Sequence, residues 1–83
     1  MDKKNKKTTL DQLKPGDKGT VVNVKIGGAI GQRLMSMGFI NGTTLVVIRN
    51  APLVDPIELQ VRDSHVSIRH SEAKYIEVIR IYE

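Results

Sequence analysis

The sequence predicts a mainly β protein: a small antiparallel barrel of about five strands with one short inserted α-helix. Three observations support this prediction. Segments rich in valine and isoleucine alternate apolar with polar residues along most of the chain, as half-buried strands do. Glycine and proline separate these segments at short intervals. Only one segment, near the centre, spaces its apolar residues as a helix does.

The first predicted elements are a helical turn and a strand. Thr9 and Gln12 match a capping box that opens the turn, and Pro15 ends it. Gly16 permits the tight turn that follows, because glycine adopts positive φ freely. Residues 19–26 are rich in valine and predict a strand. The apolar face of this strand is expected to hold alternate residues: Val22, Val24 and Ile26.

The central segment predicts the one convincing amphipathic helix. Ile30, Leu34 and Met37 stand at i, i+4 and i+7, so they line one helix face. Gly38 follows at the C′ position, where a residue with positive φ ends a helix. Leu34 and Phe39 then form the apolar pair that accompanies a Schellman ending.

The second half of the chain predicts three more strands and a loop. After a turn at Gly42, residues 44–50 predict a strand with apolar residues on both faces. Pro52 and Pro56 bracket an apolar loop, because proline cannot join a central ladder. Residues 57–61 and the segment around Val66 and Ile68 predict a hairpin, and residues 76–81 predict the last strand. Before it, one helical turn is expected with Ser71 as its N-cap. The whole fits a barrel of the SH3-like kind.

Size and composition restrict the protein to a few classes. A chain of 83 residues is one small domain, and it buries roughly 60 to 65% of its unfolded surface. There is no cysteine, which suits a reducing compartment and excludes thiolate metal sites. No apolar run approaches the about 20 residues that span a bilayer, and no signal-peptide pattern is present. We therefore expect a cytoplasmic protein that does not insert into a membrane.

The net charge of +4 is concentrated at the N-terminus. Residues 1–7 hold four lysines and one aspartate, hence +3, which leaves +1 for the other 76 residues. We expect residues 1–7 to be a flexible lysine-rich tail and residues 8–83 to be the folded domain. A weak tether to anionic lipid or to an acidic partner is the alternative for the tail.

The sequence offers little for catalysis or for metal binding. No Ser-His-Asp arrangement, HExxH or Walker motif is present. His65 and His70 are five residues apart, an odd offset that points them to opposite faces of a strand. Asp55 and Glu58 could reach one cation, but two carboxylates are a weak signal. We expect no catalytic residue, no metal ligand and no cofactor.

Gly28 and Gly31 match the GxxG clamp of KH nucleic-acid-binding domains. The helix-rich architecture of a KH domain is missing, and only three aromatic residues are available to stack on bases. The alternative is close approach between the backbones of the strand and the helix. We do not expect nucleic-acid binding.

A protein-recognition surface remains as the function of exposed apolar residues. Leu53 and Val54 occupy the proline-bracketed loop, where apolar side chains are costly unless covered. The alternative is that Leu53 folds back onto the mouth of the barrel. Met35 points away from the helix stripe, beside Arg33, and a flexible methionine suits an adaptable contact surface. Leu53 and a sheet edge would also allow a homodimer.

Taken together, these motifs resemble the FeoA family, small cytosolic proteins of bacterial ferrous iron uptake. The resemblance covers about residues 8–80. Val54 departs from it, because the family usually has glycine there, and Gly27-Gly28 loosens the approach to the helix. The matching residues are Leu10-x-x-Leu13-x-x-Gly16, Gly19-x-Val21, Arg33-Leu34-x-x-Met37-Gly38-Phe39-x-x-Gly42, Ala51-Pro-Leu-x-Asp-Pro56-Ile, Arg69 and Glu72-Ala73-x-x-Ile76-x-Val78.

The resemblance implies an SH3-like β-barrel with the helix inserted between its early strands. It also implies a partner, the FeoB membrane transporter with its cytoplasmic GTP-binding domain, and a non-enzymatic role in iron homeostasis. Whether the module stimulates, inhibits or assembles its partner stays open, as does direct contact with Fe(II). The expected partner-binding residues are Arg33, Leu34, Met35, Met37, Leu53 and Val54. The expected turn and cap residues are Gly16, Gly38, Gly42, Pro52 and Pro56.

Three other functions stay open. Iron-dependent repressors of the diphtheria-toxin-repressor kind carry a similar C-terminal barrel, so the chain could act on such a repressor, although it has no room for a helix-turn-helix of its own. A nucleic-acid-binding barrel would lose affinity steeply with salt. An arginine, Arg33 or Arg69, could act on the GTP of a partner in trans.

Overall fold

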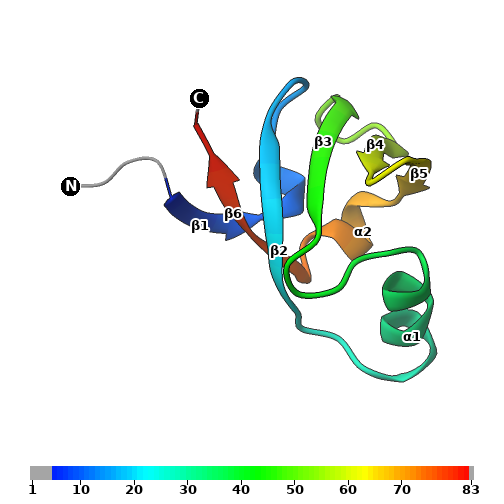
Figure 1. Ribbon diagram of the computed structural model, residues 1–83. Coiled ribbons are helices and arrows are strands. Elements are labelled where there is room, and N and C mark those ends of the chain that lie inside the picture. Colours follow the sequence, from blue (N-terminus) through cyan, green and yellow to red (C-terminus); the bar gives the residue numbers. More distant parts are fainter. Residues whose placement is uncertain (1–4, 83) are drawn as a thin grey trace.

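The computed structural model describes residues 5–82, which form a curled antiparallel sheet with two short α-helices (Figure 1). The elements follow one another as β1 (Asn5–Thr9), the 3-10 turn η1 (Leu10–Gln12), β2 (Lys18–Val24), α1 (Gly28–Ser36), β3 (Thr44–Arg49), β4 (Ile57–Val61), β5 (Ser64–Ile68), α2 (His70–Ala73) and β6 (Ile76–Ile81). Within residues 5–82, neither α1 nor α2 is long and apolar enough to cross a membrane.

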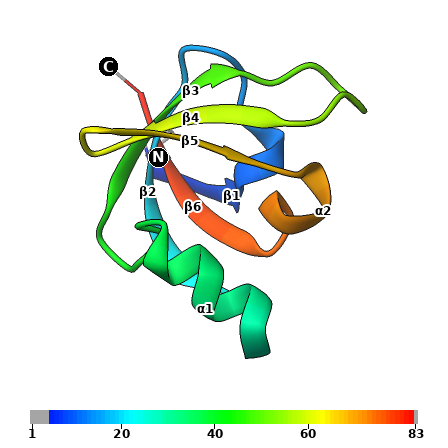
Figure 2. The same ribbon diagram turned by 90° about the vertical axis from the view of Figure 1, so that its right-hand side faces the viewer.

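The strands lie in the order β1-β6-β2-β3-β4-β5, and every neighbouring pair is antiparallel. The mainly β, antiparallel prediction with one inserted helix is confirmed. The described part of the chain has six strands rather than about five, because β1 adds a strand at the edge. The sheet curls, and α1 stands at one end of it (Figure 2).

The predicted tail was too long, because part of it forms β1. Asn5 and Lys7 pair with Ile81 and Ile79 of β6. Lys7 Nζ also lies 3.4 Å from Glu77 Oε1. Lysine-rich composition is compatible with an edge strand, where charged side chains discourage pairing with other chains. The prediction of a flexible segment is therefore wrong for residues 5–7, and its first four residues lie outside the described part.

The core lies inside the curl of the sheet and is almost entirely aliphatic. Alternation within β3, β4 and β6 places one face of each strand inward, as the sequence predicted. In β2 a register shift between Val21 and Asn23 changes which residues turn inward. Val21 is buried and Val22 only partly so, which corrects the expected place of Val22. Val24 and Ile26 pack against the core as expected. The buried apolar residues are Leu10, Leu13, Val21, Leu34, Phe39, Leu45, Val47, Ile57, Leu59, Val61, Ile68, Ala73, Ile76 and Val78.

Helix α1 ends as its sequence predicts. The Phe39 N–H donates to the Leu34 carbonyl at 3.1 Å, and the Gly38 N–H donates to the Met35 carbonyl at 3.0 Å. Gly38 has a φ of +110°, so the two bonds form a Schellman motif. Both apolar partners of the motif, Leu34 and Phe39, are fully buried. These two buried side chains fix the C-terminal end of α1 against the core.

The start of α1 differs from the expected apolar stripe, because Gly31 rather than Ile30 packs closely against the rest of the protein. Gly31 and Leu34 are the buried residues of the helix, whereas Ile30 is 45% exposed. A Cβ on Gly31 would overlap the Ile26 carbonyl oxygen just after β2. Close backbone approach, the alternative to a nucleic-acid clamp, therefore accounts for Gly31.

Of the two predicted helix caps, Thr9 is the N-cap residue of η1 but its side chain does not cap the turn, and the cap predicted for α2 is wrong. The Thr9 hydroxyl bonds Asp11 Oδ1 at 2.5 Å instead of capping η1. Helix α2 has Arg69 rather than Ser71 as its N-cap, and the Arg69 N–H donates to Glu72 Oε1 at 3.0 Å. At η1 the Asp11 carboxylate takes the hydroxyl that the sequence pattern assigned to the cap, and at α2 the helix begins one residue before Ser71.

Candidate partner-binding surface

The loop between β3 and β4, residues 51–56, holds an apolar side chain in solvent. Leu53 is 98% exposed and has a φ of +62°, and Val54 is 57% exposed. The loop extends beyond the rest of the sheet (Figure 2). Leu53 therefore does not fold back onto the barrel mouth. Pro52 and Pro56 lie within this loop, as predicted, and the Asp55–Pro56 peptide bond is cis.

His70, at the start of α2, holds the two ends of this loop together. Its ring Nδ1 lies 2.7 Å from Asp55 Oδ1, and its Nε2 lies 2.8 Å from Asn50 Oδ1. The His70 backbone N–H donates to the same Asp55 oxygen at 2.7 Å. The Asn50 Nδ2 group donates in turn to the backbone carbonyls of Leu13 and Asp11, at 2.6 and 3.1 Å. We call His70, Asp55 and Asn50 the loop bracket.

The chemistry of the loop bracket is set by acceptors on both sides of the imidazole. The Asn50 amide is oriented by its two carbonyl partners, so its oxygen must face His70. A neutral imidazole donates from one nitrogen only, so both contacts are hydrogen bonds only when the ring carries two N–H groups. The His70 backbone N–H, and then its ring, lower the pKa of Asp55 below its usual range. The loop thus has a polar, charge-assisted base.

In the sequence, His70 is a candidate only for metal binding, and its role in the loop bracket is not predicted. No periodic pattern connects Asn50, Asp55 and His70, because they meet only once the sheet has formed. Among residues 5–82 no three His, Cys, Asp or Glu side chains gather in a way that could hold a metal ion. His65 lies 3.2 Å from Glu58, so Asp55 and Glu58 have different histidine neighbours.

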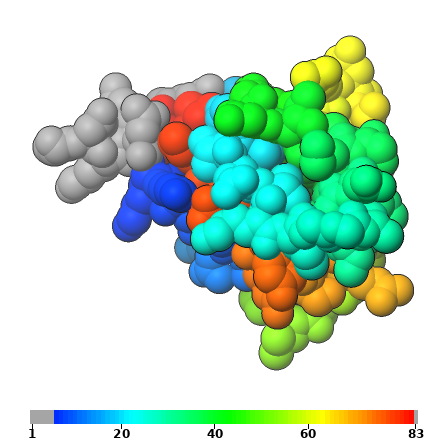
Figure 3. All heavy atoms as spheres, turned by 90° about the horizontal axis from the view of Figure 1, so that it is seen from below, coloured from blue at the N-terminus to red at the C-terminus, as the bar shows by residue number. Residues whose placement is uncertain are grey.

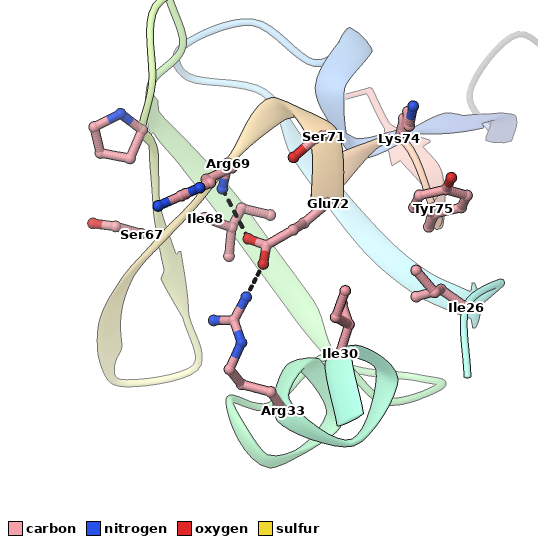
Figure 4. A pocket seen from close by; sticks show the side chains of 11 residues that line it. Ile26, Ile30, Arg33, Ser67, Ile68, Arg69, Ser71, Glu72, Lys74 and Tyr75 are labelled. Atoms are coloured by element: carbon pink, nitrogen blue, oxygen red, sulfur yellow. Dashed lines mark hydrogen bonds and ion pairs between the residues drawn. The ribbon is translucent and has the colours of Figure 1, made fainter. Parts of the chain in front are cut away.

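Arg33 joins the two helices. Its guanidinium forms an ion pair with Glu72 of α2, and its Nη1 lies 3.7 Å from the Met37 sulfur. The other Glu72 oxygen, Oε1, accepts the Arg69 N–H at the start of α2. Glu72 therefore links α1 to the helix cap of α2 (Figure 4).

The structure brings together only some of the predicted contact residues. Leu34 has no exposed surface, so its side chain is part of the core, which corrects its assignment to the contact surface. Met37 is half-buried against the core and touches Arg33. Met35 is 53% exposed but lines a separate shallow depression with Val22 and Ile40. The loop of Leu53 lies apart from α1, with α2 between them (Figure 2).

A groove of about 720 Å³ runs between α1 and the α2 region. In Figure 4 Ile30 and Arg33 stand on α1 at one side of it, with Ser71 and Glu72 opposite. From below, the end of β2, α1 and the start of β6 lie side by side on one face (Figure 3). We call the groove between α1 and the α2 region the helix groove. It is lined by Ile26, Ile30, Arg33, Pro56, Ser67, Ile68, Arg69, Ser71, Glu72, Lys74 and Tyr75.

The curled antiparallel sheet with its inserted helix defines the class of the protein: a small, mainly β domain with an SH3-like fold. Within this class the family is also shown. The model of the FeoA domain matches residues 8–80, and the chain belongs to the FeoA family.

The relatives include a fusion protein and isolated domains. The chain is 39% identical over 69 residues to the Fe(2+) transport protein A/Fe(2+) transporter FeoB fusion protein of Porphyromonas gingivalis, covering 83% of this chain but only 8% of the fusion protein. A crystal structure of the iron uptake regulatory protein FeoA superposes with a TM-score of 0.86 at 33% identity, covering 92% of this chain and all of that one. The zinc complex of Stenotrophomonas maltophilia FeoA, described as a prokaryotic SH3 domain protein, superposes with a TM-score of 0.77 at 29% identity. The match covers 86% of this chain and 88% of that one.

A metal-dependent repressor shares the fold alone. The manganese-dependent transcriptional repressor in complex with manganese superposes with a TM-score of 0.82, but at only 19% identity. The match covers 90% of this chain and 37% of the repressor. Because similar folds host unrelated functions, this likeness supports the architecture and carries no function.

Proposed function

We propose that this chain is a non-enzymatic, cytoplasmic accessory module of bacterial ferrous iron transport. It acts by direct contact with the cytoplasmic GTP-binding domain of a FeoB-like transporter. The observation that carries the proposal is the Porphyromonas gingivalis fusion protein, in which a homologous segment and FeoB are named as parts of one protein. Covalent linkage raises the effective concentration of two modules for each other toward the millimolar range, so their contact becomes stronger. A fusion is therefore expected most often between modules that act by contact with each other.

Two surface features support a contact role. The loop bracket fixes an exposed leucine by hydrogen bonds at both ends of residues 51–56, so little loop entropy is lost when a partner covers it. At the end of α1, Arg33 lines the helix groove, and its guanidinium lies 3.7 Å from the sulfur of Met37, the C-cap residue. We propose Arg33, Met37, Leu53 and Val54 as contacts, with Met35 as a peripheral one.

The experiment is an NMR titration of the labelled chain with the soluble GTP-binding domain of the FeoB transporter from the same genome. It is run at low and high salt, with and without GTP. We expect amide shifts in residues 51–56 and along α1 that persist at high salt. The substitution Leu53→Ser should weaken binding at least tenfold. Tyr82→Ser, at an exposed aromatic residue that follows β6 near the other edge of the sheet, should not.

Absence of any shift in all conditions would refute direct contact with the GTP-binding domain. Shifts that vanish at high salt and spare residues 51–56 would refute the contact surface and reduce the interaction to electrostatics. A homodimer through the Leu53 tip is the other use of this surface. It would appear as concentration-dependent broadening of the Leu53 and Val54 amides in the absence of the transporter domain.

A further inference from the structure

We propose that the helix groove is the docking site for an extended segment of the partner that carries alternating apolar and acidic side chains. This inference rests on the proposed function and specifies which part of the transporter domain would be recognised. The groove has an exposed apolar side chain on its α1 side, a net positive rim and, through Pro56, a connection to the Leu53 loop.

The α1 side of the groove exposes apolar surface. Ile30 is 45% exposed although it lies on the side of α1 that faces α2. Ile68 and Tyr75 continue the lining from the other side (Figure 4). The volume of about 720 Å³ falls within the roughly 300 to 1,000 Å³ of ligand pockets. It is large enough for more than one side chain.

The rim of the groove carries an excess of positive charge. Arg33, Arg69 and Lys74 contribute three cations and Glu72 contributes one carboxylate, hence +2. Both oxygens of Glu72 are already engaged, one by Arg33 and the other by the Arg69 N–H. Within residues 5–82 no carboxylate forms an ion pair with the side chain of Arg69 or Lys74. Lys74 Nζ lies 5.3 Å from the centroid of the Tyr75 ring, and the charge of Arg69 contributes to the lowered pKa of Asp55. Neither side chain is held by an ion pair in this part of the chain, so both can bind acidic side chains of a partner, and they disfavour a basic one.

The groove is also continuous with the proposed contact surface. Pro56, the last residue of the loop that carries Leu53, lines the groove. A partner that covers Leu53 can therefore continue into the groove without leaving the surface of the protein. An extended segment fits this path, because its alternate side chains would face Ile30 and the charged rim.

The test compares charge-matched double variants of the full chain. Arg69→Glu with Lys74→Glu reverses the open rim charges, and Lys6→Glu with Arg62→Glu makes the same change in net charge at exposed sites elsewhere. We expect the rim variant to weaken binding to the GTP-binding domain at least tenfold, and the control less than twofold. The substitution Ile30→Ser should weaken binding without strengthening its salt dependence.

A peptide arm tests the groove independently of the transporter. The probe is an eight-residue peptide of alternating leucine and glutamate, and its counterpart has lysine for glutamate. The acidic peptide should shift amides around Ile30 and from Ser67 to Tyr75, and the basic peptide should not. Equal shifts with both peptides, or none with either, would overturn the inference.

The two proposals fail differently. If the transporter domain binds the rim variant and the control equally well, the groove is not the docking site, although the proposed function stands. If the transporter domain does not bind but the acidic peptide does, the groove recognises another acidic partner and the proposed function fails. If neither binds, both proposals are refuted.

Discussion

His70 places its backbone N–H and its ring Nδ1 on the same oxygen of Asp55, each at 2.7 Å. Asp55 belongs to the loop that carries Leu53, whereas His70 begins α2. One carboxylate thus caps the first turn of a helix and closes the base of an exposed loop. Helix start and loop conformation are therefore linked, and substitutions at this pair should affect both.

We predict that Asp55→Ala lowers the free energy of unfolding and loosens residues 51–56. The change removes the acceptor for the His70 N–H and for its ring, and an exposed helix N–H then has only water as partner. Urea unfolding measures the loss of stability, and amide line widths of Leu53 and Val54 measure the loosening. The control Asp63→Ala lies in the β4–β5 turn and should change neither. An unchanged loop in Asp55→Ala would contradict the bracket.

The contribution of Asp55 to stability should disappear in acid. Its pKa is lowered from an ordinary value of 3.8 by the backbone N–H and the ring of His70. A depressed pKa in the folded state means that the unfolded state binds the proton more readily. Stability from this group is therefore fully present above the unfolded pKa and is lost as pH falls through the folded pKa. The stability difference between the wild type and Asp55→Asn should be constant at neutral pH and shrink below pH 3.8. A constant difference down to lower pH would contradict this assignment.

The sequence predicted the parts of the molecule that depend on local pattern. The alternation of apolar and polar residues predicted β3, β4 and β6, because burial of one face of a strand requires it. The glycine after the helical segment predicted the end of α1, because a helix commonly ends at a residue with positive φ. β1 was missed since strand pairing with β6 outweighed a lysine-rich composition. The loop bracket and the link from Arg33 to Glu72 join distant segments, and no local rule specifies them.

We predict that Gly31→Ala destabilises the protein, whereas Gly27→Ala does not. A Cβ on Gly31 would overlap the Ile26 carbonyl, and relieving such overpacking typically costs about 1–3 kcal/mol. Gly27 has a φ of −99° and no heavy atom within 4 Å of an added Cβ. Gly27 is also the N-cap of α1, where alanine is less favourable than glycine, and this loss offsets the gain from a less flexible unfolded chain. Gly27→Ala should therefore change the free energy of unfolding by less than about 0.5 kcal/mol. Urea unfolding of the two variants tests the pair, and equal stabilities would show that the approach of strand and helix is not tight.

Leu34 and Met35 are neighbours on α1 that should respond in opposite ways to truncation. Leu34 is fully buried beneath the Schellman ending, so Leu34→Ala should cost about 2–5 kcal/mol of stability. Met35 is 53% exposed, and Met35→Ala should change stability by less than about 0.5 kcal/mol. Binding to the transporter domain is then measured at a temperature where both variants are folded. Weaker binding by folded Met35→Ala would make Met35 a contact, whereas normal binding by folded Leu34→Ala would confirm that Leu34 acts only through the core. Loss of binding by a fully folded Leu34→Ala would instead show that the end of α1 must keep its position for the partner to bind.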